Sequence, residues 1–446
     1  MGRMIALAAA LTGALLLAWT GTRTPDPARG PSAPTAFSTE KALADIGQIA
    51  RAPHPGGSAA NARVRDYLTA RMTALGLEPA LQSGFGVETR PYRGATWVVG
   101  GQVENIVGVL PGLDRDKPAL ALMAHYDSVP ASPGAADDAT GVAVVLDVVR
   151  ALKARGPPRR DVIVILTDGE EAGLLGARVF FRDHPLRSRI GLLINLESRG
   201  GGGRANMFQT GPDNGELIST FARTAVRPIS NALAVFLYEN MPNDTDFTVS
   251  NAAGVRGLNY AFVGRQFDYH SPTSTLANLD KGSVRHMGDQ ALAAAADLAF
   301  ADALPGKSPD AVYSQTFGDH VLAYPAGGGW IVLLIAAGLI TLAATRARRA
   351  GGLSLIDTAR GAGAALFLLI AGALLLHLAR KATGVGFGFM EQRPLLAQWG
   401  LWETTLALMG VGLLLLVPVL QARGGARWAL AATALVAGLL CSVFGG

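Results

Sequence analysis

Imidazole and carboxylate side chains follow four short apolar runs in the middle of this chain. The runs and the groups that follow them are Ala119–Ala124 with His125 and Asp127, Val162–Thr167 with Glu170 and Glu171, Leu192–Leu196 with Glu197, and Leu258–Val263 with His270. A tight loop between the first two runs, residues 134–141, adds the paired acids Asp137 and Asp138. Neighbouring parallel strands bring their carboxyl ends to one edge of a sheet, where open α/β sheets bind their ligands. The sequence therefore predicts a single crevice lined by acids and two imidazoles.

So many acids in one crevice predict a bound cation. Burying unpaired carboxylates costs several kcal/mol each, and these motifs contain no lysine or arginine. Histidine with aspartate and glutamate is the donor set of a catalytic zinc-type site, and the only cysteine of the chain is Cys441. The number of candidate ligands fits two ions about 3.5–4 Å apart, sharing one bridging carboxylate, better than a single ion.

A two-metal site of this kind performs hydrolysis. It lowers the pKa of water and polarises a carbonyl oxygen, while a carboxylate outside the metal shell moves the proton of the water to the leaving amine. Of the pair Glu170 and Glu171, one acid can bind metal and the other can act as this base. Asp127, two positions after His125, points the same way if the strand continues. It can therefore hold the imidazole in place.

Between residues 38 and 304 the pattern alternates between helices and short buried strands. Ser58–Leu75 is amphipathic, with Gly76 at its C-cap position, and Val142–Ala154 and Gly215–Thr224 also predict helices. Val103–Leu110 predicts a further buried strand. This alternation predicts an α/β domain with a mostly parallel (mixed) sheet and helices on both faces.

The two ends of the chain predict membrane segments. Hydrophobic residues make up 50% of the 446 residues and charged residues 16%, against about 25% charged residues in an ordinary soluble domain. Ile5–Ala18 is short for a bilayer span, so residues 1–21 are either a cleaved signal peptide or an uncleaved anchor. Residues 22–37 and 305–327 are expected to be linkers, the first of them flexible. Residues 328–446 are expected to form an all-α region of four transmembrane helices, at Trp330–Thr345, Gly361–Ala379, Leu401–Leu420 and Trp428–Phe444.

The charges of the loops predict the orientation. Arginines gather between the first two spans and between the last two, at Arg346, Arg348, Arg349 and Arg360 and at Arg423 and Arg427. The positive-inside rule places these loops in the cytoplasm, so the central domain is expected on the extracytoplasmic side. No basic stripe with interleaved aromatic residues is present, so nucleic acid is not an expected partner.

Five motifs, in order, resemble those of the co-catalytic zinc aminopeptidases typified by bacterial leucyl and Streptomyces aminopeptidases. They are His125-Tyr126-Asp127-Ser128, Gly134–Gly141, Asp168-Gly169-Glu170-Glu171 with Gly173, Asn195-Leu196-Glu197 and Tyr269-His270-Ser271. The chain is most similar to the membrane-bound branch, the endoplasmic reticulum metallopeptidase and vacuolar membrane protease family, because further motifs and the hydrophobic C-terminal part also match. Those motifs are Pro53–Ser58, Phe208–Pro212 and Asn243–Phe247. The resemblance covers Arg51 to about Ala295 well, and the membrane part only in layout.

This resemblance implies a role for each site residue. His125 and Glu197 would bind one zinc ion and Glu171 and His270 a second, with Asp137 bridging the two ions and Glu170 as the general base. The choice of Asp137 over Asp138 comes from the family's aspartate four residues before its loop glycine, here Gly141. One departure concerns the loop after His270, where the family commonly has an aspartate and this chain has Ser274.

The resemblance implies a membrane-anchored zinc exopeptidase that hydrolyses peptide bonds near a free amino terminus, with a peptide substrate and a lipid bilayer as partners. Two alternatives are a non-catalytic membrane or sorting protein that retains the fold and a glutaminyl-cyclase-like acyltransferase. The complete set of ligands and the motifs of the membrane-bound branch favour the exopeptidase.

Overall fold

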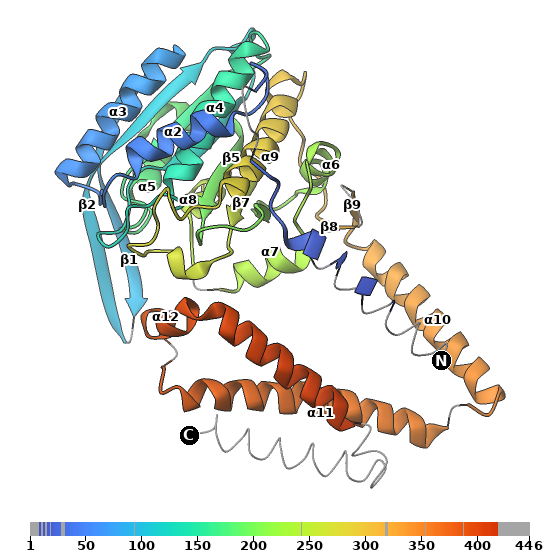
Figure 1. The fold of residues 1–446 in the computed structure, drawn as a ribbon. Helices are drawn as coiled ribbons and strands as arrows, with labels where there is room; N and C mark the ends of the chain where they lie inside the picture. Colours follow the sequence, from blue (N-terminus) through green and yellow to red (C-terminus); the bar gives the residue numbers. More distant parts are fainter. Residues whose placement is uncertain are drawn as a thin grey trace. The chain divides into compact units, whose positions relative to one another are not determined.

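The computed structural model describes residues 32–417 without residues 93, 242, 317–319, 353 and 387, together with residues 19–27 and positions 9, 12, 13, 16 and 17. The chain divides into two compact units, residues 1–329 and residues 330–446. Each unit is described by itself below (Figure 1).

A seven-stranded sheet forms the centre of the first unit. In sheet order the strands are β1 (Ala80–Tyr92), β2 (Ala95–Leu110), β4 (Val162–Thr167), β3 (Ala119–His125), β5 (Ile190–Ser198), β7 (Gly257–Phe262) and β6 (Asn206–Thr210). The four strands β4, β3, β5 and β7 run parallel. The outer strands β1, β2 and β6 pair antiparallel to their neighbours. The sheet is therefore mixed, with a parallel centre.

Both faces of the sheet are covered by helices. Along β3, Leu120 and Leu122 belong to one hydrophobic cluster, whereas Ala121 and Met123 belong to another, because side chains alternate across a strand. The first cluster contains α2 (Thr39–Ile49), α3 (Ala59–Leu75), α4 (Ala139–Ala154), α6 (Gly215–Thr224) and α9 (Lys281–Phe300). The second contains α5 (Leu175–Asp183) and α8 (Asp246–Ala252). The predicted α/β class, a mixed sheet with helices on both faces, is confirmed.

Capping residues fix both ends of helix α3 and the start of helix α4. Helix α3 begins after Ser58, whose side chain accepts the backbone N–H of Asn61, and ends at Gly76 with φ 78°. Helix α4 begins after Asp138, whose Oδ1 accepts the backbone N–H of Gly141 at 2.9 Å. The first turn of α4 therefore fixes the loop that carries the paired acids.

The remaining elements of this unit lie around the sheet. They are α7 (Ala232–Glu239), the short 3₁₀ helices η1 (Pro185–Arg189) and η2 (Gln266–Asp268), and a two-stranded antiparallel sheet of β8 (Ala311–Gln315) and β9 (Val321–Pro325). Strands β8 and β9 lie within residues 305–327, where the sequence indicated only a linker. Isolated bridges connect Asn214 with Ser308 and Asn231 with Ser314, so this stretch pairs with the domain.

The second unit is helical and apolar. Its helices are α10 (Gly328–Arg349, which begins in the first unit), α11 (Leu355–Ala382), α12 (Phe389–Ala397) and a helix over Trp399–Val417. Among the described residues, three helices are long and apolar enough to span a bilayer, namely α10, α11 and Trp399–Val417. The fourth predicted span, Trp428–Phe444, and most of Ile5–Ala18 lie outside the described residues.

Candidate metal centre

The parallel strands bring the predicted site residues to one edge of the sheet. His125 is the last residue of β3, and Glu197 is the next-to-last residue of β5. Glu170 and Glu171 follow β4, and His270 follows η2, shortly after β7. Because β4, β3, β5 and β7 are adjacent and parallel, these groups meet although they come from distant parts of the sequence.

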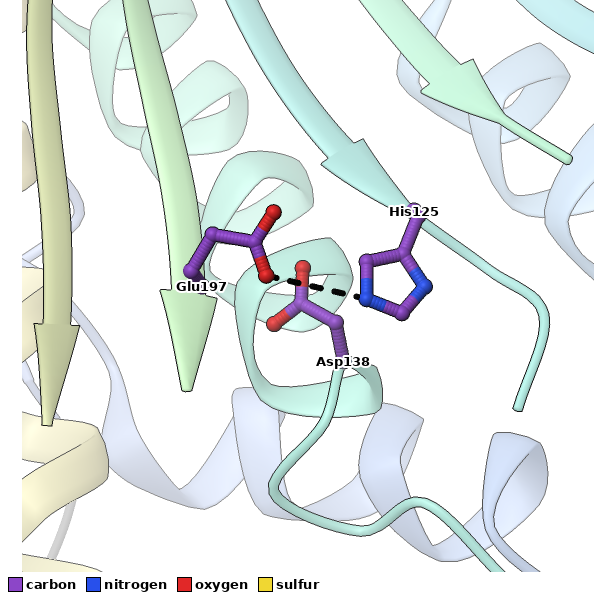
Figure 2. A group of neighbouring side chains, drawn as sticks. All are labelled: His125, Asp138 and Glu197. Carbon is purple, nitrogen blue, oxygen red and sulfur yellow. Dashed lines mark ion pairs between the residues drawn. The ribbon is translucent and has the colours of Figure 1, made fainter. Parts of the chain in front are cut away.

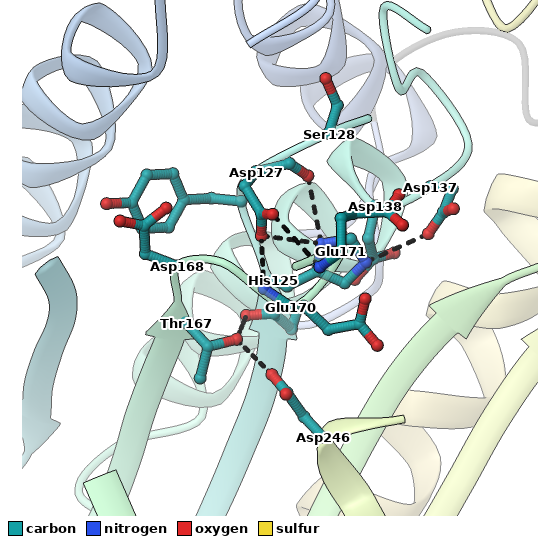
Figure 3. A network of polar contacts seen from close by, with 12 residues as sticks. His125, Asp127, Ser128, Asp137, Asp138, Thr167, Asp168, Glu170, Glu171 and Asp246 are labelled. Carbon is teal, nitrogen blue, oxygen red and sulfur yellow. Dashed lines mark hydrogen bonds and ion pairs between the residues drawn. The ribbon is translucent and has the colours of Figure 1, made fainter. Parts of the chain in front are cut away.

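Asp137 lies next to His125 (Figure 3), and it also reaches His270. Its Oδ1 is 3.1 Å from His125 Nε2, and its Oδ2 is 3.2 Å from His270 Nε2. Glu171 Oε2 is 2.8 Å from His270 Nε2, and Glu197 Oε2 is 3.7 Å from His125 Nε2. The structure therefore brings together all five residues expected to bind metal, with the two carboxylate oxygens of one aspartate directed to different imidazoles.

Asp138 also lies at this centre (Figure 2). Ligand atoms of His125, Asp138 and Glu197 lie within 4.8 Å of one another, and so do those of His125, Asp137 and Glu171. Asp138 uses one oxygen to cap α4, while its buried Oδ2 has no hydrogen-bond partner among the described residues. Asp137 differs because neither of its oxygens is committed to a helix cap, and each faces a histidine.

The acids of this centre carry strongly shifted pKa values. Burial raises the pKa of Glu197 to about 8 and that of Glu171 to about 7. Burial would also raise the pKa of Asp137, but the imidazoles of His125 and His270 hold it below its ordinary value. Burial alone would lower the pKa of His125, yet the charge of Glu170 and its contacts with nearby aspartates raise it well above the usual range. The carboxyl groups outnumber the two imidazoles, and those without a positive partner are pushed by burial towards their neutral form.

Asp127 positions the groups behind the metal ligands. Its Oδ1 accepts the backbone N–H of Glu170 at 3.0 Å, and its Oδ2 accepts that of Glu171 at 3.3 Å. Its Oδ1 also lies 3.4 Å from His125 Nδ1, which faces the Asp127 carbonyl oxygen at 3.1 Å. Nδ1 of His125 therefore contacts Asp127, whereas Nε2 faces Asp137 and Glu197. One buried carboxylate fixes both the imidazole and the turn that carries the glutamate pair.

Glu170 and Asp246 are two further acids of this centre (Figure 3). Burial raises the pKa of Glu170 well above its usual range, and Glu197, Glu171 and Asp246 add to that effect by their charges. Asp246 is the first residue of α8 and accepts a short hydrogen bond from the Thr167 hydroxyl. Asp246 belongs to the motif Asn243–Phe247 of the sequence, and the structure places it fully buried.

Two tyrosines at the centre were given no role from the sequence. The ring of Tyr269 stacks on the imidazole of His270, with centroids 3.7 Å apart. Tyr238 of α7 lies near enough for Glu197 to act on it: burial raises the pKa of its hydroxyl, and the charge of Glu197 adds to the effect. Tyr269 could have been identified from the sequence because it stands next to His270. No local pattern of the sequence points to Tyr238.

Ser274 joins the loop after His270 to the loop that carries Asp137. The backbone N–H of Ala135 donates to the Ser274 carbonyl oxygen at 3.1 Å, and that of Ala136 lies 3.5 Å from its hydroxyl. Ser274 is buried. The two loops are thus connected in this chain without the aspartate expected at this position.

The donor set fits zinc. Imidazole nitrogens with carboxylate oxygens, and no thiolate, are typical of catalytic zinc sites. Asp138 Oδ2 and Asp246 Oδ1 are buried without a hydrogen-bond partner among the described residues, which is costly for polar atoms that have no ligand. Within that same part of the chain, the ion-pair partners of Asp137, Glu171 and Glu197 are histidines and not arginine or lysine.

Sequence comparison relates the domain to membrane proteases. Over 247 residues it is 37% identical to the vacuolar membrane protease of Candida dubliniensis, covering 54% of this chain and 26% of that protein. Over 238 residues it is 34% identical to endoplasmic reticulum metallopeptidase 1 of Mus musculus, covering 52% of this chain and 26% of that protein. The chain thus spans about a quarter of the length of these curated relatives.

Structural comparison identifies the same fold in an aminopeptidase from Aneurinibacillus sp. strain AM-1. The TM-score is 0.51 at 14% identity, and the match covers 64% of this chain and 99% of that one. At this identity the similarity establishes the fold alone. A family model, described as Peptidase family M28, matches residues 105–295, a segment that contains all the expected site residues. By this match and the motifs within it, the α/β domain of this chain is similar to peptidase family M28.

Proposed function

We propose that this chain is a membrane-anchored, zinc-dependent exopeptidase that hydrolyses peptide bonds next to a free amino terminus. The match to the model of peptidase family M28 and the similarity to membrane proteases support a membrane zinc peptidase. The observation that carries the proposal is the position of Asp137, with one carboxylate oxygen facing His125 and the other facing His270. A single acid placed in this way can serve two cations.

The chain's own residues provide two metal positions in this proposal. His125 and Glu197 would hold one zinc ion, Glu171 and His270 the second, and Asp137 both. Zinc supplies Lewis acidity, which lowers the pKa of water and polarises a carbonyl oxygen. The remaining chemistry belongs to protein groups that bind no metal.

Glu170 moves the proton in this proposal. Its carboxylate accepts a proton from the attacking water and gives it to the nitrogen of the leaving amine. Asp127 acts as a positioning residue, because it accepts the backbone N–H groups of Glu170 and Glu171 and faces His125 Nδ1. Because the carbonyl and carboxylate oxygens of Asp127 face Nδ1 of His125, Nε2 is the nitrogen that would bind metal.

The membrane part sets where the reaction takes place. We propose residues 38–304 as the peptidase domain and residues 328–446 as its membrane region, with an N-terminal signal or anchor before residue 22. The last turn of α10 carries Arg346, Arg348 and Arg349. Arginines at that end favour the cytoplasmic side, which leaves the peptidase domain in an extracytoplasmic compartment.

The test is a zinc count and an activity assay on the full-length chain in lipid nanodiscs. We expect two zinc ions per chain and hydrolysis of aminoacyl amides that a chelator abolishes. Glu170→Gln should retain both ions and lose activity by about 10²–10⁴-fold, whereas Glu40→Gln, an exposed change in α2, should behave like the parent. Unchanged hydrolysis in Glu170→Gln would contradict the assignment of the base. One ion together with cyclisation of N-terminal glutaminyl peptides would favour the acyltransferase, and the absence of zinc the non-catalytic protein.

A further inference from the structure

Helix α7 (Ala232–Glu239) exposes large apolar side chains. Leu233, Phe236 and Leu237 are 65%, 61% and 54% exposed, and Met241, just beyond the helix, is 49% exposed. No charged residue occurs in the helix before Glu239. Single exposed apolar residues are ordinary, but a contiguous apolar patch marks an interaction surface. These four residues are called the α7 face below.

The helix that carries this face is well held on its other side. The Asn231 side chain accepts the backbone N–H of Ala234 at 2.8 Å and so caps the helix. Val235 packs against the main hydrophobic cluster. The ring of Tyr238 meets that of Phe208 edge-on, with centroids 4.7 Å apart. The exposed residues are therefore the outer face of a packed helix.

The α7 face lies beside the strand pair that leads into the membrane. Asn231, just before α7, forms a bridge with Ser314 of β8. Further along the helix, Phe236 lines a surface pocket together with Ala311 of the same strand. Helix α7 therefore lies next to β8.

The membrane span α10 follows this strand pair almost at once. The backbone N–H of Ala326, directly after β9, donates to the Asp310 carbonyl oxygen at 3.1 Å, and α10 begins at Gly328. At about 3.5 Å per residue, so short a connection holds the first turn of α10 within roughly 10 Å of the end of β9. The start of α10, at Gly328, therefore follows closely on the strand pair that lies beside α7.

The residues that follow the N-terminal apolar segment contact the same part of the domain. The Arg204 guanidinium donates to the Gly21 carbonyl oxygen at 2.7 Å and to the Arg227 carbonyl oxygen at 2.5 Å. Arg227 stands a few residues before α7. Gly21 and the residues that lead into α10 therefore both lie close to the helix that exposes apolar side chains.

We propose that the α7 face lies in the interfacial layer of the phospholipid bilayer that holds the chain's own spanning helices. Apolar side chains of a surface helix bury about 5–10 Å into the boundary between headgroups and acyl chains. A second copy of the chain is a poorer occupant, because four partly exposed side chains offer far less than the roughly 800 Å² per partner of a stable interface.

The proposal is tested by the collision accessibility of a nitroxide label. The full-length chain with Cys441→Ser receives one cysteine, Leu237→Cys, which is labelled and reconstituted into phosphatidylcholine and phosphatidylglycerol vesicles. The matched control is Ala70→Cys on the exposed face of α3. We expect the ratio of oxygen to nickel-chelate collisions to be several-fold higher at position 237 than at position 70. Adding Phe236→Glu to the position-237 variant should lower that ratio.

The outcomes separate the possible occupants. Equal ratios at positions 237 and 70 would mean that the α7 face is in water, and would overturn the proposal. Low accessibility to both reagents, with dipolar broadening between labels, would identify a second copy of the chain and would overturn it as well. Because the measurement does not depend on hydrolysis, its failure would leave the proposed peptidase activity untouched.

Discussion

Strand β4 has a buried aspartate at each end, and the two aspartates have different surroundings. Asp161, just before the strand, is 2.9 Å from Arg189 Nη1 and 3.4 Å from Arg115 Nε. Asp168, just after it, accepts the backbone N–H of Glu104 at 3.1 Å and has no arginine or lysine ion pair in the described part of the chain. Burial, aided by the charge of Asp127, raises the pKa of Asp168 to about 7.

The same difference in surroundings is found between other acids of the domain. Acids away from the metal centre pair with arginine: Asp45 lies 2.8 Å from Arg71 and Asp147 lies 2.6 Å from Arg150. At the carboxyl edge the positive groups close to the acids are imidazoles. An arginine there would neutralise a carboxylate permanently, whereas an acid without one remains available to a cation. The contrast between the two ends of β4 therefore separates acids that pair with arginine from acids at the edge that carries the metal centre.

Loss of Asp137 should have the largest effect. In Asp137→Ala the one carboxylate that faces both histidines is gone, so we expect loss of zinc from the centre and hydrolysis at background level. Asp161→Asn, at the arginine-paired end of β4, should keep the zinc content and the specific activity of the folded protein. Elemental analysis and aminoacyl amide hydrolysis measure both. If Asp137→Ala bound zinc as tightly as the parent, the distinction between the two classes of acid would fail.

Asp127→Asn should have the next largest effect. The amide keeps the shape of the carboxylate but directs an NH₂ group at one of the N–H donors of Glu170 and Glu171. Changes in groups that orient metal ligands typically cost 10–100-fold in metal affinity or activity, and we expect a loss of about that size. Zinc titration with a competing chelator, together with kcat and KM, will show it. Asp127→Glu, which restores the charge, should recover part of the activity. Equal activity in all three proteins would limit Asp127 to a packing role.

The centre of the fold could be predicted from the sequence, but its edge could not. Strands β3, β4, β5 and β7 are runs of apolar residues buried on both faces, which is a strong local pattern. Strand β1 is interrupted by glycines, and those glycines let α5 approach: a Cβ at Gly86 would lie 2.8 Å from the Leu175 carbonyl oxygen. Strands β8 and β9 are held by contacts with Asn214 and Asn231, so their pairing depends on residues distant in sequence.

The residue types of the metal centre could also be predicted, because each follows a recognisable strand. The geometry that distinguishes Asp137 from Asp138 could not, since adjacent acids differ only in the direction that the loop gives them. Tyr238 reaches the neighbourhood of Glu197 from α7, a helix that no motif connects to the site. Such contacts depend on the packing of separate elements, which a single sequence does not reveal.

Asp161→Asn should reduce stability without changing the chemistry. The variant leaves Arg189 and Arg115 without their carboxylate, but both guanidinium groups are partly exposed and can bind water. We expect a loss of about 1–3 kcal/mol in the free energy of unfolding of the domain, measured as a lower Tm in the presence of zinc. An unchanged Tm would mean that these arginine pairs contribute little, as exposed pairs do.

Asp168→Asn should increase the stability of the domain, whereas Asp161→Asn should decrease it. An acid whose pKa is higher in the folded chain contributes its full stability below its ordinary value of 3.8 and loses it as the pH rises to about 7. The variant should therefore gain Tm relative to the parent between about pH 4 and pH 7, and keep the gain at higher pH. The gain is reduced because the amide offers only one acceptor oxygen in place of two. A pH series of Tm for both proteins measures it, and a constant difference across the series would contradict the assigned pKa.

Ser274→Ala should have the smallest effect, and it tests how the loop after His270 is held. The backbone N–H of Ala135 donates to the Ser274 carbonyl oxygen, which alanine retains, whereas the hydroxyl lies at the long distance of 3.5 Å from the Ala136 nitrogen. Loss of so weak a bond should cost less than about 1 kcal/mol, which corresponds to at most a few-fold change in zinc affinity at the His270 position. Ser274→Pro, which perturbs the same backbone, should cost more. A large loss in Ser274→Ala would mean that the hydroxyl, and not the backbone, replaces the aspartate that related peptidases carry at this position.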